Sequence, residues 1–379
     1  MSNVIFSIST IPGDGIGPDV IESAIKIVDK ASLIIGSFQC KWDFIKAGAT
    51  YFKETGLDVE DGGEEKAGKS DAIFLGAIGL PNVRKEDGTE IAPHLRFREK
   101  FGLYAGVRPV KAYPNSPQRL KDSNSRKINL VILRECTEGL FYTASVHNRN
   151  PIANNNEVHD VMKITRKTSK KLHDFAFKLA RKRKLKGSLG KVTCVDKANV
   201  FKSQALFRKV FEEVKTNFTD IQSDTSYVDA MALNLIRSPW DYDVLVMENI
   251  FGDILSDMGG GLVGGMGMAS CAEIGDDHGL FQPAHGSAPD IMGENKANPL
   301  ATILSASMML EYLADKHNNK AADNAAKLIE NSIEYGFEKN LLRPNEFGGD
   351  MGTSQVTDQI LTLLDRSYNL RSKNVCNHS

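Results

Sequence analysis

Two carboxylates in the middle of the chain, Asp253 and Asp257, have the spacing of a metal site. They follow the apolar run Val244–Met247, which predicts a buried strand, and the segment after it predicts the start of a helix. Side chains four positions apart share one helix face, about 6 Å apart at Cβ, so their charges repel unless a cation lies between them. A solvated helix face is the commoner meaning of such a pair, but α/β sheets bind ligands where buried strands end. We therefore predict a site for Mg²⁺ or Mn²⁺, which prefer oxygen ligands.

Lys197 and Asp229 could complete this chemistry. Lys197 follows the predicted strand Lys191–Asp196, and Asp229 stands at a predicted helix start. A surface ion pair and a helix cap are the ordinary roles of such residues. Beside a metal, however, the lysine could accept a proton and the aspartate could supply a third oxygen ligand.

Three arginines lie near the ends of predicted elements. Arg98 is in a stretch that opens a helix, Arg108 begins an extended segment, and Arg134 follows the apolar run Leu130–Leu133. Each guanidinium fork matches one carboxylate, so together they could clamp a substrate that bears two. Each alone is more often a surface ion pair, and their company with a metal site supports the clamp.

The elements around these residues predict an α/β sheet. A strand at Val4–Ile8, a glycine-rich turn at 12–18 and a helix at about 19–32 resemble a dinucleotide fingerprint, but the glycine spacing is wrong and Pro18 follows. We favour a tight turn over direct phosphate binding. A second buried strand, Asp71–Gly79, also ends in glycines. The small residues at 281–291 form a loop that could wrap phosphates, with Asp290 as an acceptor for a ribose diol.

Bulk composition excludes several classes of protein. The chain has 379 residues, a net charge of -1, 41% hydrophobic residues and five widely spaced cysteines without a C-x-x-C motif. These values predict two domains in a reducing compartment, without a disulfide framework or a zinc site. The basic run Arg181–Lys184 fits a solvated helix end better than a nucleic-acid site. We see no signal peptide and no membrane span, so we expect a cytoplasmic protein that binds neither nucleic acid nor membrane.

The motifs together resemble one family, the metal-dependent β-decarboxylating dehydrogenases that act on 3-isopropylmalate, isocitrate, homoisocitrate, and tartrate or D-malate. The similarity covers about residues 4–365. It is carried by Pro12–Pro18, Arg98 with Arg108 and Arg134, Val195–Val200, Tyr227–Ala230, Asn249–Asp257 and His285–Asp290.

This resemblance implies roles for the chemical residues. Arg98, Arg108 and Arg134 would bind the malate carboxylates. Asp253 and Asp257 would bind Mg²⁺ or Mn²⁺ together with Asp229 of a second subunit, and Lys197 would reach across as the general base. The implied assembly is a homodimer with shared active sites.

The resemblance also implies an α/β fold of the isopropylmalate-dehydrogenase type, not a Rossmann fold. A discontinuous large domain would comprise 1–103 and 264–379, and a small domain 104–263. The cofactor would be NAD, because Asp290 would repel the 2′-phosphate of NADP. Its contacts would be Ile16, His285, Gly286, Ser287, Ala288, Asp290 and Asn298.

Two positions depart from the family pattern. Most members have a tyrosine seven residues after the arginine that matches Arg134, where this chain has Phe141 followed by Tyr142. In a regular strand Tyr142 would face the other way, and a bulge would bring it back, so Tyr142 is the candidate proton donor. Isopropylmalate enzymes have a leucine pair before Arg98; this chain has His94 and Leu95, which we assign to substrate binding.

We expect oxidative decarboxylation of a 3-substituted (R)-malate, with conversion of 3-isopropylmalate to 4-methyl-2-oxopentanoate in leucine biosynthesis as the first choice. Isocitrate enzymes have serine and asparagine where this chain has Ala92 and His94, and the stretch Phe97–Phe101 is more similar to tartrate or D-malate dehydrogenase. Tartrate, D-malate, isocitrate and homoisocitrate therefore stay open. A non-catalytic regulatory subunit is the alternative of another class; Phe141 favours it, and the intact lysine, aspartates and arginines argue against it.

Overall fold

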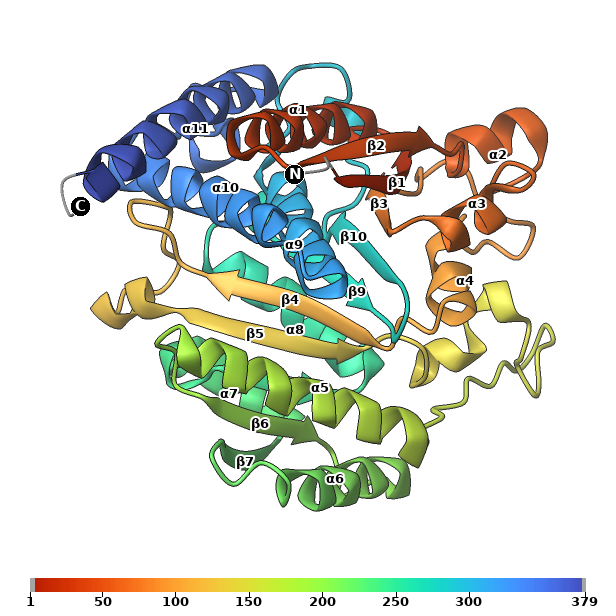
Figure 1. Cartoon of the computed structure of the whole chain (residues 1–379). Helices are drawn as coiled ribbons and strands as arrows, with labels where there is room; N and C mark the ends of the chain where they lie inside the picture. The colour runs from red at the N-terminus through yellow and green to blue at the C-terminus, as the bar shows by residue number, and fades with distance from the viewer. Residues whose placement is uncertain (1–3, 377–379) are drawn as a thin grey trace.

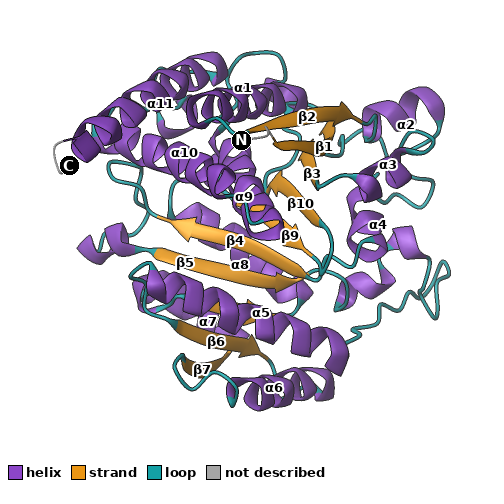
Figure 2. Cartoon of the chain, in the orientation of Figure 1, coloured by secondary structure: helices purple, strands orange, loops and turns teal. Residues whose placement is uncertain are grey.

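The computed structural model describes residues 4–376, and their side chains up to residue 366. One ten-stranded sheet runs through the molecule with helices on both faces (Figures 1 and 2). The strands are β1 Val4–Gly13, β2 Phe38–Phe44, β3 Ala72–Ala77, β4 Ala105–Lys111, β5 Asn129–Glu135, β6 Lys191–Asp196, β7 Gln222–Tyr227, β8 Val244–Met247, β9 Ser270–Ile274 and β10 Gly279–Pro283.

The helices form two layers. They are α1 Gly17–Ile35, α2 Ala49–Thr55, α3 Gly63–Lys69, α4 Pro93–Lys100, α5 Arg166–Leu185, α6 Lys202–Lys215, α7 Val228–Arg237, α8 Asn249–Leu262, α9 Leu300–His317, α10 Lys320–Glu338 and α11 Thr353–Cys376. One large core joins a sheet face to α1, α5, α6, α9, α10 and α11. On the other face a second core includes α7 and α8, and a third includes α3 and α4. Within residues 4–376 no helix combines the length and the apolar character needed to cross a membrane.

The strand order is β2-β1-β3-β10-β9-β4-β5-β8-β6-β7. The strands are parallel from β2 to β10 and from β5 to β7, and antiparallel from β10 to β5. Strands from the two terminal segments occupy one end of the sheet and strands from the middle segment the other. The sheet crosses the expected domain border without a break through β4 and β9, so the boundaries at 103/104 and 263/264 stay a prediction.

The glycine-rich segment at the end of β1 forms a tight turn, and our preference for this role over phosphate binding stays a prediction. Asp14 is buried, and its carboxylate accepts hydrogen bonds from the backbone N–H groups of Ala49, Thr50 and Gly79 at 2.7–2.8 Å. Gly15 has a φ of 57°, and a Cβ there would lie 2.0 Å from the carbonyl oxygen of Ser287. The turn therefore packs directly against the backbone of the loop that contains Ser287.

The sheet register brings two of the arginines together. Gly106 of β4 pairs with Arg134 of β5, and Arg108 pairs with Ile132. Because alternate residues share a face, Arg108 and Arg134 are diagonal neighbours on the face that α8 covers.

Glycines let α8 lie close to these strands. A Cβ at Gly252 would come within 2.6 Å of the Arg134 Cβ, and one at Gly259 within 2.7 Å of Val110. The buried Glu248 caps α8, accepting hydrogen bonds from the N–H groups of Ile250 and Phe251 at 3.2 Å. The helix expected after β8 therefore forms, and its acidic face lies over the arginines.

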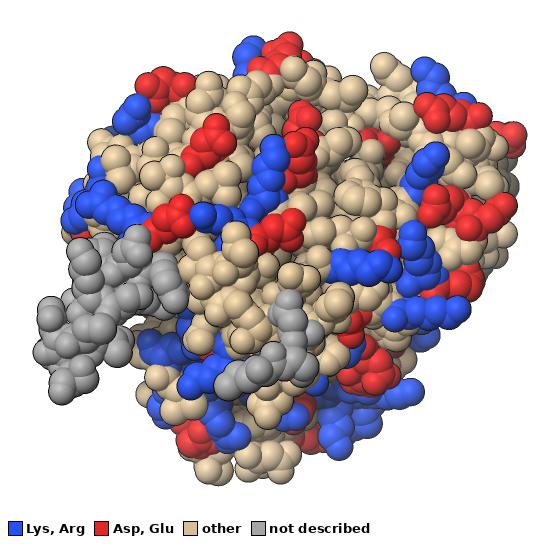
Figure 3. Space-filling model, turned by 45° about the horizontal axis from the view of Figure 1, so that its top comes forward, with Lys and Arg blue, Asp and Glu red and all other residues tan. Residues whose placement is uncertain are grey.

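The basic run at the end of α5 is engaged in ion pairs and hydrogen bonds. Its four side chains bind Asp220, Asp315, Asp243 and the backbone oxygen of Asp220 in turn. Figure 3 shows basic and acidic side chains interspersed over the face drawn. These partners support a structural role for the run.

Candidate active site

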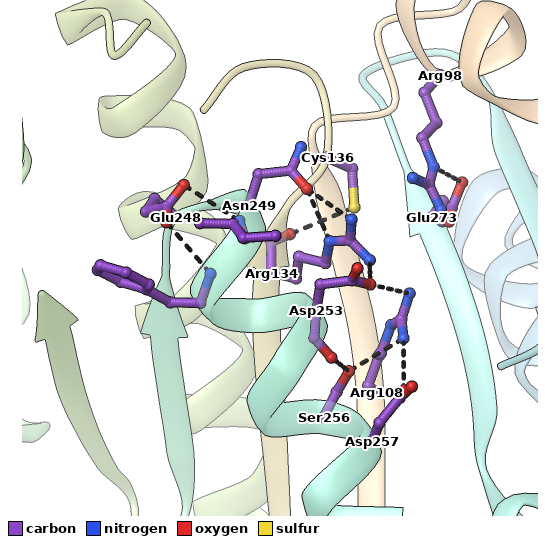
Figure 4. Close-up of polar contacts among 12 residues, drawn as sticks. Arg98, Arg108, Arg134, Cys136, Glu248, Asn249, Asp253, Ser256, Asp257 and Glu273 are labelled. Atoms are coloured by element: carbon purple, nitrogen blue, oxygen red, sulfur yellow. Dashed lines mark hydrogen bonds and ion pairs between the residues drawn. The ribbon is translucent and has the colours of Figure 1, made fainter. Parts of the chain in front are cut away.

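Arg134 is the most deeply buried of the three arginines, with 1% of its surface exposed. Its Nε and Nη2 donate to the Asn249 side-chain oxygen at 2.9 and 2.6 Å, and Nη1 forms an ion pair with Asp253 (Figure 4). Asn249 in turn donates to the backbone oxygen of Glu138 at 3.0 Å. Burial, and then the neighbouring Arg98 and Arg108, lower the pKa of Arg134. The start of α8 therefore fixes Arg134 beside Arg98 and Arg108.

Arg108 is less completely paired. Its Nη1 donates to the Ser256 hydroxyl at 3.0 Å and lies 3.5 Å from Asp257 Oδ1, while Nη2 lies 4.0 Å from Asp253 Oδ1. Its buried Nε has no hydrogen-bond partner among the described residues. A buried unsatisfied guanidinium N–H is costly, so this group is suited to an anionic ligand.

Arg98 reaches the site from α4 and is held by Glu273 of β9. Its Nε and Nη2 donate to the two carboxylate oxygens of Glu273 at 2.9 and 2.5 Å (Figure 4). Burial alone would raise the pKa of Glu273, but Arg98 lowers it to about 2. The pair is therefore fully charged.

All three arginines, Asp253 and Asp257 line one cavity of about 330 Å³. His94 and Leu95 line it too, and their role in substrate binding stays a prediction. Burial and the charge of Arg98 lower the pKa of His94 to about 3, so its ring is neutral. Its buried Nδ1 also has no partner among the described residues.

The cavity suits a divalent cation on the α8 side. Asp253 and Asp257 both face it, and burial is the main cause that raises the pKa of Asp257, which the nearby Asp253 raises further. A cation between the two carboxylates would offset their repulsion. No group of three His, Cys, Asp or Glu side chains within the described part of this single chain could hold a metal.

Lys197 and Asp229 lie together outside this cavity. They follow the last residue pair of the parallel strands β6 and β7, and Lys197 Nζ is 2.6 Å from Asp229 Oδ1. The hydrogen bond from Lys197 lowers the pKa of Asp229. Neither residue lines the arginine cavity of its own chain.

Phe141, and not Tyr142, faces the cavity. Both lie in a short 3₁₀ helix, Leu140–Thr143, instead of the strand that we considered. The Phe141 ring lies 4.8 Å from the Arg134 guanidinium, whereas the Tyr142 ring packs against Arg149 and Lys163. The assignment of Tyr142 as proton donor stays a prediction, and the single chain does not place its ring in the cavity lining.

A second cavity, of about 550 Å³, adjoins the first, and the two share Asp257, Ala284, His285 and Gly286. Of the expected cofactor contacts, Ile16, His285, Gly286, Ala288 and Asn298 line it. The buried Nε2 of His285 has no partner among the described residues. The Ser287 hydroxyl instead binds the backbone oxygen of Gly79, and Asp290 is exposed outside the lining.

Two acidic residues of the site, Glu346 and Glu273, were missed from the sequence. Glu346 accepts hydrogen bonds from Asn298 at 2.9 Å and from the Gly267 N–H at 3.0 Å. A Cβ at Gly267 would collide with Glu346, so this glycine serves close packing. Glu273 was also missed, although a single acidic residue within the apolar stretch 268–274 is a signal of a buried ion pair.

Comparisons with known proteins identify the family. A family model described as isocitrate/isopropylmalate dehydrogenase matches residues 7–360. The 3-isopropylmalate dehydrogenase of Aquifex aeolicus is 37% identical, covering 95% of this chain and 98% of the relative. The homoisocitrate dehydrogenase of Methanocaldococcus jannaschii is also 37% identical, with the same coverage.

Among solved structures, the isocitrate dehydrogenase from Methylococcus capsulatus matches with a TM-score of 0.80 and 32% identity, over 95% of this chain and 99% of that chain. The expected α/β fold of this type is therefore confirmed. The chain belongs to the isocitrate/isopropylmalate dehydrogenase family and is a dehydrogenase of that type.

Proposed function

We propose that the protein catalyses the NAD-dependent, Mg²⁺- or Mn²⁺-dependent oxidative decarboxylation of a 3-substituted (R)-malate. The first choice of substrate is 3-isopropylmalate, which would give 4-methyl-2-oxopentanoate, CO₂ and NADH in leucine biosynthesis. Relatives at equal identity are named for isopropylmalate and for homoisocitrate, so overall identity does not choose between these substrates.

The observation that carries the proposal is the convergence of three arginines and two aspartates on one cavity. A substrate carboxylate at Arg108 would satisfy its orphaned Nε, and Arg98 and Arg134 offer further donors for a second carboxylate. Only a small anion with more than one carboxylate would use all three groups.

The residues of the chain divide the work. The arginines would hold the carboxylates, so that the hydroxyl carbon is oriented and its hydride can leave for the nicotinamide. Lys197 of a second copy would accept the hydroxyl proton. A divalent cation held by Asp253 and Asp257 would polarise the substrate oxygen as electrons shift during oxidation and loss of CO₂. A proton on the resulting enolate then completes the reaction, for which Tyr142 is the candidate donor.

The position of the second cavity supports NAD as the hydride acceptor. The second cavity adjoins the first at His285 and Gly286, so a dinucleotide in it could present its nicotinamide to the substrate. Burial lowers the pKa of the His285 ring, which favours its neutral form. The unpartnered Nε2 of this ring is then available to hydrogen-bond a cofactor. Asp290 is exposed, where it could accept from a ribose diol and oppose a 2′-phosphate.

The location of Lys197 and Asp229 supports a homodimer with shared sites. Both residues are outside the cavity of their own chain, and the cavity provides only two of the expected metal ligands. Leu233 and Ile236 of α7 and Ile254 of α8 are at least half exposed, which provides an apolar surface for a second copy.

The cavity wall that would contact the substrate combines apolar and polar side chains. Leu95, Ile78 and Ala92 give an apolar surface that suits an isopropyl group, while the neutral His94 offers a polar group. One such contact discriminates by only about 1–3 kcal/mol. Tartrate, D-malate, isocitrate and homoisocitrate therefore belong in the assay.

The test is NAD reduction with Mg²⁺ or Mn²⁺ over 3-isopropylmalate, D-malate, tartrate, isocitrate and homoisocitrate. We expect turnover that is lost with EDTA, with 3-isopropylmalate giving the highest kcat/KM. Binding of one of these acids without turnover would instead support the regulatory subunit, for which Phe141 in the cavity is the specific observation.

A further inference from the structure

Glu273 is a carboxylate in the middle of the sheet. It lies on β9 between β4 and β10, paired with Gly106 and Leu280, and none of its surface is exposed. Its side chain forms a two-point ion pair with Arg98, which is 5% exposed. Charges are rarely buried to this extent, because the cost of removing them from water must be offset by excellent geometry.

Neighbouring strands fix the orientation of Glu273. The Gln282 side chain on β10 donates to Glu273 Oε1 at 2.9 Å. The Ser305 hydroxyl on α9 lies 2.8 Å from the backbone oxygens of both Gln282 and Ala301, to which it can donate, and it accepts from the Cys271 N–H at 3.2 Å. The Glu273 carboxylate is therefore held by the Gln282 side chain as well as by Arg98, and Ser305 ties the backbones of β9 and β10 to α9.

This network leaves Arg98 with one free edge. Nε and Nη2 are committed to Glu273, while Nη1 has no hydrogen-bond partner among the described residues. Arg98 lines the arginine cavity, whereas Glu273 does not. We infer that Glu273, held by Gln282, is a positioning residue that sets which edge of Arg98 meets the substrate carboxylate. The inference rests on the proposed function.

Glu273 could either neutralise the charge of Arg98 or orient its guanidinium group, and these two roles differ in what they require of the side chain. If it only neutralised Arg98, any carboxylate at that place would serve. If it sets the guanidinium plane, the two oxygens must remain at the reach of glutamate, because a misplacement of about 1 Å in a substrate-orienting group can cost about a hundredfold in rate.

Two variants separate these roles. Glu273→Gln keeps the size and removes the charge and one acceptor, and we expect kcat to fall about 10- to 100-fold. The KM for the acid should change by less than kcat, because the added positive charge attracts the dianion while its orientation is lost. Glu273→Asp keeps the charge but shortens the side chain, and its kcat should fall at least about tenfold.

A double-mutant cycle shows whether Glu273 acts through Arg98. We expect Arg98→Met and Arg98→Met/Glu273→Gln to have the same kcat within about twofold, because without Arg98 nothing remains to be positioned. The double variant also removes both buried charges, so it should be more stable than Arg98→Met alone.

Asp243→Asn is the matched control. Asp243 is 1% exposed and forms a carboxylate–arginine pair with Arg183, Nε to Oδ1 at 2.5 Å. It precedes the first residue of β8, whereas α8 follows the last. Its substitution should lower the melting temperature while leaving kcat per folded molecule and the KM unchanged. A variant that only weakens the fold would behave in this way.

Either of two results would overturn the inference. One is a wild-type kcat in Glu273→Asp. The other is a double variant whose loss of kcat equals the product of the losses in Arg98→Met and Glu273→Gln, since the two residues would then act independently. The same cycle on the affinity for D-malate, measured by calorimetry without NAD, needs no turnover. A wild type that binds D-malate but reduces NAD with no acid would refute the proposed function alone, and the affinity cycle would still decide the inference. A wild type that binds and oxidises no acid would refute both.

Discussion

Replacing Arg108 by methionine should disable substrate capture with little cost to the fold. In the ligand-free protein the guanidinium has one neutral hydrogen bond, to Ser256 at 3.0 Å, and longer ionic contacts to Asp253 and Asp257. Its loss also relieves repulsion, since Arg98 and Arg108 both lower the pKa of Arg134. These effects oppose each other, so we expect the stability to change by no more than about 1 kcal/mol.

The expected loss in catalysis is much larger. The orphaned Nε and one Nη of Arg108 can give two charge-assisted hydrogen bonds to a carboxylate. Each is worth about 1.5–3 kcal/mol, so together they supply about 3–6 kcal/mol. We therefore expect kcat/KM to fall about a hundredfold to ten-thousandfold. Arg108→Lys, which keeps the charge and loses the fork, should fall between the wild type and Arg108→Met.

The assay is initial-rate NADH formation at saturating NAD and Mn²⁺, with the concentration of the acid varied, alongside thermal unfolding. Arg96→Met is the matched control. Arg96 lies on the same helix as Arg98 but pairs with Asp58 and Glu64 outside the cavity, at 2.5 and 3.0 Å. The control should lose stability and keep the wild-type KM.

A kcat/KM in Arg108→Met within about threefold of the wild type would refute the reasoning, because it would mean that no carboxylate meets the unpartnered Nε. A large fall accompanied by an equal fall in the folded fraction would refute it as well, since the proposed function gives this side chain a role in ligand binding and not in the stability of the fold.

Three further substitutions test other parts of the site. Asp253→Asn removes a ligand charge and should lower metal-dependent NADH formation by more than about a thousandfold, and retention of most of the rate would remove the metal assignment. Tyr142→Phe should slow protonation of the enolate that remains after CO₂ is lost, measured as the ratio of the 2-keto acid product to NADH at early times, if its hydroxyl reaches a partner's site; an unchanged ratio would assign the proton to water or another group. Asp290→Lys should shift the ratio of kcat/KM for NAD and NADP toward NADP by about tenfold, and no shift would show that other residues such as Lys296 govern the choice.

The sequence predicted the parts of the site whose signals are local. Val244–Met247 and the spacing of Asp253 and Asp257 predicted a strand followed by an acidic helix face, and β8 and α8 have this form. The apolar run before Arg134 likewise placed that arginine at the end of β5. Periodicity and spacing suffice where one element defines the position.

Contacts between distant elements were not predictable in the same way. Arg98 and Glu273 are 175 residues apart, and no pattern along the chain shows that α4 and β9 meet. The conformation at Phe141 depends on the chain that surrounds it, which forms a 3₁₀ helix where we considered a strand. Lys197 does not line the cavity of its own chain, so neither the sequence pattern nor the structure of one chain brings it to the arginines.

The pairing of Arg134 with Asp253 has a consequence for how ligands enter. Arg98, Arg108 and Arg134 face Glu273, Asp253 and Asp257, so the formal charges of these six groups cancel. If the cavity binds a metal and a dicarboxylate as proposed, a dication alone would have to pull an aspartate from its arginine, and a dianion alone would have to do the reverse. When both bind, each would release the partner that the other requires. We therefore expect each ligand to raise the affinity for the other, and by the same factor.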